Sequence, residues 1–194
     1  MNRTSDDERE QTYWITGRDQ IICLASAVRS DIVDHLAAAE PLSVKQLAAQ
    51  LGKRPSALYH HLDQLIAVDL VREVGARVRR KKSEKLYQTP SRRMRLIRAL
   101  GDPANRDDMI EMVAANSRRA KADFAKALGR PDAKVAGTGR NLGFYRMMTR
   151  PSKATLEKVN AHLDEIAELL WESQDEKEPL VSLSWIISPT GSDN

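Results

Sequence analysis

The sequence predicts a mainly α-helical protein with a small β component, and three observations support this fold class. Apolar residues recur every three to four positions in several segments, most regularly over residues 152–172. Two β-prone runs flank a basic, Gly-containing stretch within residues 71–90, which is the pattern of a β-hairpin. The chain has 194 residues, of which 41% are hydrophobic, and this suits one domain or a small domain with an appended unit.

The composition indicates the cellular compartment. A single cysteine, Cys23, excludes an intrachain disulfide framework and suits a reducing environment. No apolar run approaches the roughly 18 residues of a membrane span, and the polar, partly acidic N-terminus resembles neither a secretory signal nor a transit peptide. We therefore expect a cytoplasmic protein that does not associate with membranes.

Charge is distributed unevenly along the chain, whose net charge is +4 at pH 7. Residues 53–98 hold thirteen Lys and Arg against four Asp and Glu, a balance of +9. Residues 151–194 hold three Lys against nine Asp and Glu, a balance of −6. A basic block of this kind is typical of a surface that meets a polyanion, although a solvated charged face is the alternative.

The N-terminal part predicts a tail and two helices. We expect residues 1–16 to form a flexible tail and residues 17–39 to form one helix that ends before Pro41, because the residue before a proline disfavours helical geometry. Ser43 and Gln46 match a capping box at the start of a short second helix. That helix should end at Gly52, since glycine is a common C-terminal signal.

A third helix and a hairpin follow. Pro55 suits the first turn of a helix that runs to residue 68. After Leu70 we expect one β-arm, a long charged tip and a second arm at residues 85–89. Two short helices joined by a tight turn and followed by a hairpin make a winged helix-turn-helix domain, which we place at residues 17–100. The inner face of the third helix is expected to hold Leu58, His61, Leu62, Leu65 and Ile66.

Residues 101–194 predict a helical region with a short two-stranded sheet, suited to dimerisation or effector sensing. Asp102 and Pro103 match the cap and first turn of a helix over residues 104–128. Residues 152–172 form the clearest amphipathic helix of this half. The β-prone segments 144–150 and 179–188 are expected to pair as strands.

A set of eleven residues within residues 47–90 follows a known pattern: Leu47, Ala48, Leu51, Gly52, His61, Leu62, Leu65, Leu70, Val71, Leu86 and Tyr87. With these residues in register, the stretch resembles the winged helix of ArsR-type (arsenic-repressor-like) transcriptional regulators. The resemblance implies a dimeric DNA-binding regulator. Asp69 departs from the pattern, because the family usually has Gly at the end of the recognition helix; Asp tolerates a left-handed backbone better than most residues. The C-x-C motif of the metal-sensing branch is absent, since residues 45–51 hold no Cys or His, so the resemblance is to the non-metal-sensing branch.

A recognition helix contacts double-stranded DNA with the outward residues of its N-terminal part. Arg54 could donate to guanine or clamp a phosphate, and basic wing residues would lie along a groove or the backbone. The alternative for an individual position is that an exposed Ser or Tyr makes no contact with DNA. The expected DNA-binding residues are Lys53, Arg54, Ser56, Tyr59 and His60 on the turn and helix, and Arg77, Arg79, Arg80, Lys81 and Lys82 on the wing.

The histidines predict no metal site. His60 and His61 are neighbours about 100° apart on a helix, so they cannot easily chelate one ion, whereas useful helical pairs are spaced four apart. His35 and His162 lie in separate helices and could share an ion only across a dimer. We expect His61 to be half-buried and His60 to lie on the DNA-facing side, with no metal or other cofactor.

No enzyme is predicted either. Gly137 and Gly139 belong to a stretch too short for a phosphate-binding loop. The roughly 100 residues after the hairpin leave no room for a cofactor-binding α/β domain of ordinary size. Cys23 lies in an apolar helical run and is expected to be a packing residue rather than a nucleophile.

The function predicted from the sequence is a dimeric, sequence-specific transcriptional regulator, and a repressor, controlled by an unidentified signal. The alternative is a winged-helix module that binds protein. The apolar residues expected at a dimer contact could instead pack within their own chain. Those that could line a pocket for a small apolar ligand could instead be ordinary core residues. The expected dimer contacts are Ile21, Leu24, Val28, Leu156, Leu163, Ile166 and Leu170. The candidate pocket residues are Met109, Met112, Phe124, Phe144, Tyr145, Met147, Trp171 and Trp185.

Overall fold

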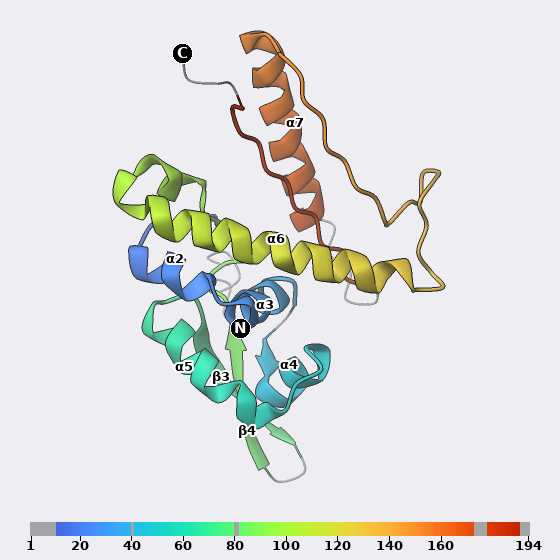
Figure 1. Ribbon diagram of the computed structural model, residues 1–194. Helices are drawn as coiled ribbons and strands as arrows, with labels where there is room; N and C mark the ends of the chain where they lie inside the picture. The colour runs from blue at the N-terminus through green and yellow to red at the C-terminus, as the bar shows by residue number, and fades with distance from the viewer. Residues whose placement is uncertain (1–10, 40, 80–81, 173–177, 191–194) are drawn as a thin grey trace.

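The structure, a computed structural model, describes residues 11–39, 41–79, 82–172 and 178–190, and confirms a mainly helical chain with a small β component (Figure 1). The helices are α2 (Arg18–Leu24), α3 (Ala27–Ala37), α4 (Val44–Gln50), α5 (Tyr59–Ala67), α6 (Arg106–Leu128) and α7 (Lys153–Glu172). The strands are β1 (Tyr13–Trp14), β2 (Leu42–Ser43), β3 (Arg72–Arg79), β4 (Lys82–Gln88) and β5 (Met94–Arg95). Short 3-10 helices span Pro55–Ala57 (η1), Ile97–Gly101 (η2) and Pro103–Asn105 (η3).

The prediction of one helix over residues 17–39 is wrong, because the chain breaks at residues 25–26 into α2 and α3. Ser26 has an extended backbone, with φ −84° and ψ 121°. Side chains of α3 bind carbonyl groups at the end of α2: Arg29 Nε donates to the Cys23 carbonyl at 2.6 Å, and Ser30 Oγ donates to the Leu24 carbonyl at 2.7 Å. Apolar spacing alone does not reveal such a break.

The first helix of the helix-turn-helix, α4, begins and ends with the predicted capping residues. Ser43 caps α4, and Gln46 closes the capping box from the third position. Gly52 ends α4 with φ +62°, and the next amide, that of Lys53, donates to the Ala48 carbonyl at 2.9 Å. This left-handed arrangement is a Schellman motif, which glycine adopts without steric cost.

The C-terminus of α5 repeats this motif without a glycine. Asp69 has φ +54°, and the Leu70 amide donates to the Leu65 carbonyl at 2.9 Å. The Asp69 carboxylate accepts two hydrogen bonds from Arg72, at 2.8 and 2.9 Å, and one from the Tyr13 hydroxyl at 3.2 Å. The left-handed position predicted at Asp69 is therefore confirmed, and its side chain is tied to its neighbours.

The hairpin is confirmed, but its tip is shorter than predicted. β3 and β4 pair antiparallel out to Arg79 and Lys82, so the second arm begins before the predicted residue 85. β2 joins β4 on its other edge, which gives a three-stranded sheet in the order β2-β4-β3. Arg80 and Lys81 lie outside the described residues.

Ordered structure begins before Gly17, so the prediction of a tail is wrong for residues 13–16. Strand β1 pairs in parallel with β5, with Tyr13 opposite Met94. Ile15 is 3% exposed and belongs to the core. Residues 1–10 lie outside the described part of the chain.

One apolar core runs through the winged helix and into α6. Cys23 is buried in it, as predicted for a packing residue. Ile21 and Leu24 are also buried, at 0% and 6% exposure, so the prediction that they form a dimer contact is wrong: both face the core of their own chain. Met109 and Met112 of α6 belong to the same cluster.

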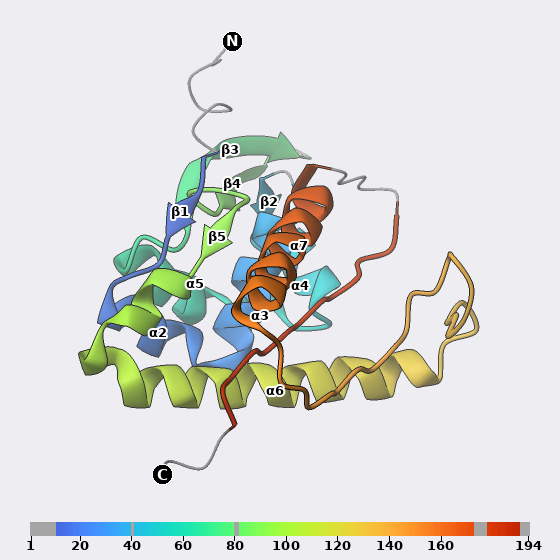
Figure 2. The same cartoon turned by 90° about the horizontal axis from the view of Figure 1, so that it is seen from above.

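The predicted helix over residues 104–128 is confirmed as η3 followed by α6. The Asp102 carboxylate accepts from the Ala104 amide at 2.9 Å and caps this segment. Figures 1 and 2 show α6 lying across α2 and α3. Ion pairs hold it there: Arg119 binds Asp31 and Asp34, and Arg18 binds Asp108.

The amphipathic helix predicted over residues 152–172 is confirmed as α7. The two strands predicted to flank it are not formed, because residues 144–150 and 179–188 run as extended chain without regular pairing. The small β component of the described chain therefore lies within residues 13–95, from β1 to β5. Among the described residues, no helix is both long and apolar enough to cross a bilayer.

Candidate nucleic-acid interface

The inner face of α5 fixes which residues point outward. Leu58, Leu62 and Leu65 are each at most 1% exposed and pack into the core, as predicted. Ile66 was expected on this face but is 39% exposed, so it lies at the edge of the helix. A helix buried along this face presents its opposite side, and the turn before it, to solvent.

The structure brings the five candidate residues of the turn and of the first turn of α5 together on the surface. All five are exposed, and Tyr59 exposes 52% of its surface. None of their side chains makes a hydrogen bond or an ion pair with another described residue. Their polar groups are therefore open to a partner. The five residues are Lys53, Arg54, Ser56, Tyr59 and His60.

The hairpin stands beside the N-terminal end of α5, at the opposite end of the molecule from α7 (Figure 1). Arg77 is exposed, and its Nη2 donates to Gln46 Oε1 of α4 at 2.8 Å. Lys45 Nζ lies 2.6 Å from Glu84 Oε1 and makes a second link between α4 and the hairpin. These contacts fix the wing against the helix-turn-helix.

Only part of the predicted wing site can be located. Arg79 and Lys82 are paired positions at the ends of β3 and β4, but their side chains lie outside the described part. Arg80 and Lys81 are also outside it. Of the five wing residues, Arg77 alone is placed with its side chain.

The two adjacent histidines occupy different environments, as predicted. His60 is exposed, whereas His61 is half-buried and its Nδ1 is buried without a hydrogen-bond partner. Burial lowers the pKa of His61, and the nearby positive charge of Arg29 lowers it further. The ring centroids of the two histidines are 6.1 Å apart, and the ring planes are tilted by 52°.

The remaining histidines have other partners. His35 Nδ1 lies 3.2 Å from Gln50 Oε1, and His162 Nδ1 lies 3.0 Å from Glu165 Oε2. Within the described ranges, no group of three His, Cys, Asp or Glu side chains is placed to hold a metal ion. Burial raises the pKa of the Cys23 thiol, which disfavours the reactive thiolate.

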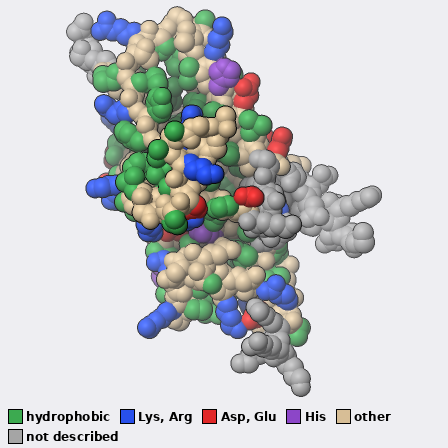
Figure 3. Space-filling model, turned by 90° about the vertical axis from the view of Figure 1, so that its right-hand side faces the viewer, with side chains coloured by type: hydrophobic (Ala, Val, Ile, Leu, Met, Phe, Trp, Pro, Cys, Tyr) green, Lys and Arg blue, Asp and Glu red, His purple; other side chains and the backbone are tan. Residues whose placement is uncertain are grey.

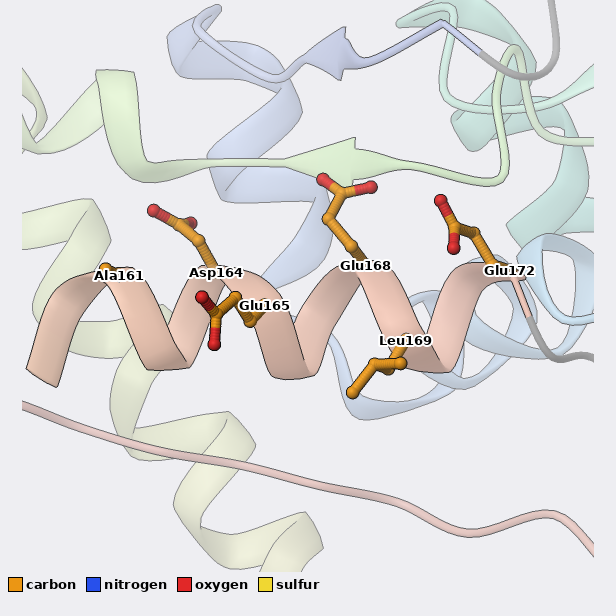
Figure 4. Close-up of a pocket in the computed structure, with 6 residues that line it drawn as sticks. All are labelled: Ala161, Asp164, Glu165, Glu168, Leu169 and Glu172. Atoms are coloured by element: carbon orange, nitrogen blue, oxygen red, sulfur yellow. The ribbon is translucent and has the colours of Figure 1, made fainter.

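A charge cluster that no pattern in the sequence predicts attaches α7 to the winged helix. We call it the α7 anchor: Arg93, Arg95, Asp164, Glu168, Trp171 and Glu172. Glu168 forms ion pairs with both arginines, with Arg93 Nη1 at 3.0 Å from Oε2 and Arg95 Nη2 at 3.0 Å from Oε1. Arg95 Nη1 lies 3.3 Å from Asp164, and Arg93 Nη2 lies 3.9 Å from Glu172. Figure 4 shows the three carboxylates pointing from α7 toward β5.

The anchor borders an open hollow of about 650 Å³ whose lining comes from α7 alone (Figure 4). A second hollow, of about 470 Å³, lies between η2 and the start of α6. Of the eight candidate ligand-pocket residues, only Met109 lines either hollow. Phe144, Tyr145 and Met147 are 71–87% exposed on the extended segment, so the predicted apolar pocket is not assembled.

The four dimer candidates of α7 are accessible, unlike Ile21 and Leu24. Leu156, Ile166 and Leu170 are 38–48% exposed, and Leu163 is half-buried. Val28 of α3 is half-buried at the edge of the core. The C-terminal helix therefore offers the larger apolar surface of the two predicted dimer elements.

Comparison with known proteins bears on residues 24–74, which match the family model of a helix-turn-helix domain. The chain carries a helix-turn-helix domain. The match runs from the end of α2 through α5 into β3, so it includes the whole exposed set on the turn and α5. No curated protein matches the chain. Domains of this kind bind DNA.

Proposed function

We propose that this chain is a cytoplasmic, sequence-specific DNA-binding transcriptional regulator that acts as a dimeric repressor. It resembles the non-metal-sensing branch of ArsR-type regulators. The observation that carries the proposal is the exposed set at Lys53, Arg54, Ser56, Tyr59 and His60, which lies opposite an inner face of buried leucines within the matched domain. A surface of this kind, with a wing beside it, fits the major groove of double-stranded DNA.

Each part of the interface has a distinct role in this proposal. Arg54, at the start of η1, donates to a guanine edge or a phosphate, and Tyr59 and His60 reach base edges from the first turn of α5. Arg77 and the rest of the wing lie along the sugar–phosphate backbone and add affinity without sequence information. Binding is therefore steeply dependent on salt.

Residues 17–100 bind DNA in this scheme, and residues 101–194 dimerise the protein or sense an effector. A two-fold dimer would place two α5 helices about one helical turn of DNA apart, roughly 34–36 Å. We propose no metal, no cofactor and no enzymatic activity. A small apolar ligand remains a candidate effector, and the hollow between η2 and α6 is the apolar depression available to it.

The test is binding of the purified chain to the DNA upstream of its own gene, compared with random DNA at about 150 mM salt. A specific regulator should bind its site at least about 10³-fold more tightly than random DNA. Equal affinity for both, at every upstream sequence tried, would contradict the proposal.

The alternative is a winged-helix module that binds protein instead of DNA. It uses the same exposed surface but needs no guanidinium at the turn. Replacement of Arg54 and Arg79 by Ala separates the two functions, because a protein-binding module would keep its activity and a DNA-binding regulator would lose affinity.

A further inference from the structure

Helix α7 is attached to the rest of the chain by its polar side. With about 3.6 residues per turn, Asp164, Glu168 and Glu172 fall on one side of the helix, facing β5, and an apolar stripe falls on the opposite side. Only Ala167 is buried among the residues of α7. The α7 stripe consists of Leu156, Val159, Leu163, Ile166 and Leu170, four of which are 38–48% exposed.

A second apolar surface lies in the C-terminal segment, residues 180–187. This segment is extended and carries no charged residue, and its described backbone groups make no backbone hydrogen bond. Side chains alternate between two sides of an extended chain, so one side is wholly apolar. That side consists of Val181, Leu183, Trp185 and Ile187, which are 46–63% exposed.

Within one chain the segment runs past α7 (Figures 1 and 4), but it leaves both surfaces largely uncovered, because four residues of the stripe and all four of the segment keep 38–63% exposure. Figure 3 shows hydrophobic side chains gathered on the upper part of the molecule, the end where Figure 1 draws α7. Contiguous apolar surface of this extent on a folded chain marks an interaction site. The occupant must offer an apolar extended segment to the α7 stripe and an apolar helix to residues 180–187.

We propose that the occupant is a second copy of this chain, with residues 180–187 of each copy lying along the α7 stripe of the other. The inference rests on the proposed dimeric regulator and specifies how its two chains join. Each chain carries both a segment and a stripe, so two copies satisfy one another reciprocally and close the assembly with two-fold symmetry. The unpaired β-prone backbone of the segment is then shielded by the partner.

Area and charge favour this occupant. The exposed apolar side chains of the stripe and the segment together amount to an area on the order of the ~800 Å² per partner that a stable interface buries. The segment has no cation with which to bind a nucleic acid. Burial of an uncharged segment against leucines incurs no charge desolvation, which suits an obligate contact between copies.

The α7 anchor gives this contact a fixed direction. Because Arg93 and Arg95 hold the acidic side of α7 against β5, the stripe stays turned outward from each winged helix. Exchange of the C-terminal segments would therefore set the distance between the two α5 helices. The same contact would therefore join the two chains and fix the spacing of their DNA-binding helices.

Cysteine pairing tests the exchange directly. Val159→Cys and Leu183→Cys proteins are prepared separately, mixed and oxidised, with the unmodified chain as a control for its buried Cys23. The expected result is a covalent dimer that forms from the mixture and from neither single variant nor the control. A disulfide that forms only within one chain of the double variant, or only between identical single variants, would overturn the proposal.

Sedimentation supplies a second measurement that does not depend on disulfide formation. Leu183→Asp should weaken self-association at least about tenfold, because it places a charge in the apolar contact. Ser182→Asp should not, because Ser182 lies on the other side of the extended segment. Equal effects of the two variants, or a monomer at micromolar concentration for the unmodified chain, would overturn the exchange.

DNA binding, measured in parallel, separates the two proposals. Specific DNA binding by a chain that proves monomeric would reject the segment exchange and leave the proposed function standing. A segment-exchanged dimer without DNA specificity would reject the proposed function alone.

Discussion

The guanidinium carbon of Arg95 lies 4.9 Å from the centroid of the Trp171 ring, and the same guanidinium bonds to Asp164 and Glu168. Residues 95 and 171 are far apart in sequence, and their contact joins the strand after the wing to the C-terminal helix. Arg95 exposes only 22% of its side chain, so its ion pairs are less screened than those at an open surface. The attachment of α7 therefore depends on charge more than on apolar packing.

The first prediction concerns this attachment. Arg95→Met keeps most of the apolar stem but removes the charge, and should lower the free energy of unfolding by about 1–2 kcal/mol through the lost ion pairs and cation–π contact. Amide hydrogen exchange should speed up selectively in α7. Lys158→Met, which removes an exposed cation from the same helix, is the matched control. Unchanged exchange in α7 for both variants would show that the anchor does not hold the helix.

The second prediction concerns pH. The pKa of His61 is lowered from its usual value near 6.5, mainly by burial, so the folded chain binds fewer protons than the unfolded chain below that pH. This contribution to stability is present above pH 6.5 and is lost as the pH falls toward the lowered pKa. His61→Leu should flatten the decrease in melting temperature between about pH 6.5 and pH 5.

His162→Gln is the control for this titration, since it removes an exposed histidine on α7. A His61→Leu protein whose melting temperature falls as steeply as that of the control would assign the pH dependence to other groups.

The third prediction concerns the turn of the helix-turn-helix. Gly52 has φ +62°, where an added Cβ strains the backbone although no neighbouring atom lies within 4 Å. Gly52→Ala should therefore cost about 1–2 kcal/mol of unfolding free energy, measured by urea titration. Gly101→Ala is matched, because that glycine also has open space around it but lacks a positive φ. Equal stabilities of the two variants would contradict the strain argument.

Local signals in the sequence predicted the helix-turn-helix and the hairpin, because caps and turns act over a few residues. The Ser43 capping box, the end of α4 at Gly52 and the left-handed Asp69 all follow from side-chain chemistry near the position itself. The outward placement of Tyr59 and His60 follows from helical spacing once the buried face is known.

Interactions over long sequence separations were not predictable. The parallel pairing of β1 with β5 joins two-residue strands that lack an alternation pattern, and the break in the first helix depends on Arg29 and Ser30 reaching back to free carbonyls. The two C-terminal segments have high β propensity, but propensity does not provide a partner strand within the chain.

The charge asymmetry of the sequence does not belong to a polyanion site alone. Two cations of the basic block, Arg93 and Arg95, pair with Asp164, Glu168 and Glu172 of the acidic block. Part of the charge on each block is thus neutralised within the chain. Among the described side chains of residues 42–88, the cations without an ion pair are Lys53, Arg54 and Arg77.

The fourth prediction concerns metals. His60 and His61 do not converge on one point, and no metal-type cluster forms among the described residues. Exhaustive dialysis against a chelator should therefore leave DNA affinity and melting temperature unchanged. A chelator that abolished DNA binding by the purified chain, and a metal that restored it, would contradict the assignment of these histidines.

The fifth prediction separates base contacts from general charge. Arg54→Ala should weaken binding to the specific site by about 1–3 kcal/mol if the guanidinium reads a base, and should lower the salt slope by about one if it binds a phosphate. Arg130→Ala changes the net charge equally, but Arg130 pairs with Asp132 just beyond the end of α6. It should affect neither quantity. His60→Ala should relax discrimination between bases, because the exposed imidazole lies beside Tyr59 on the outward face. Identical binding curves for the Arg54 and Arg130 variants would remove this turn from the interface and leave the wing as the principal DNA contact.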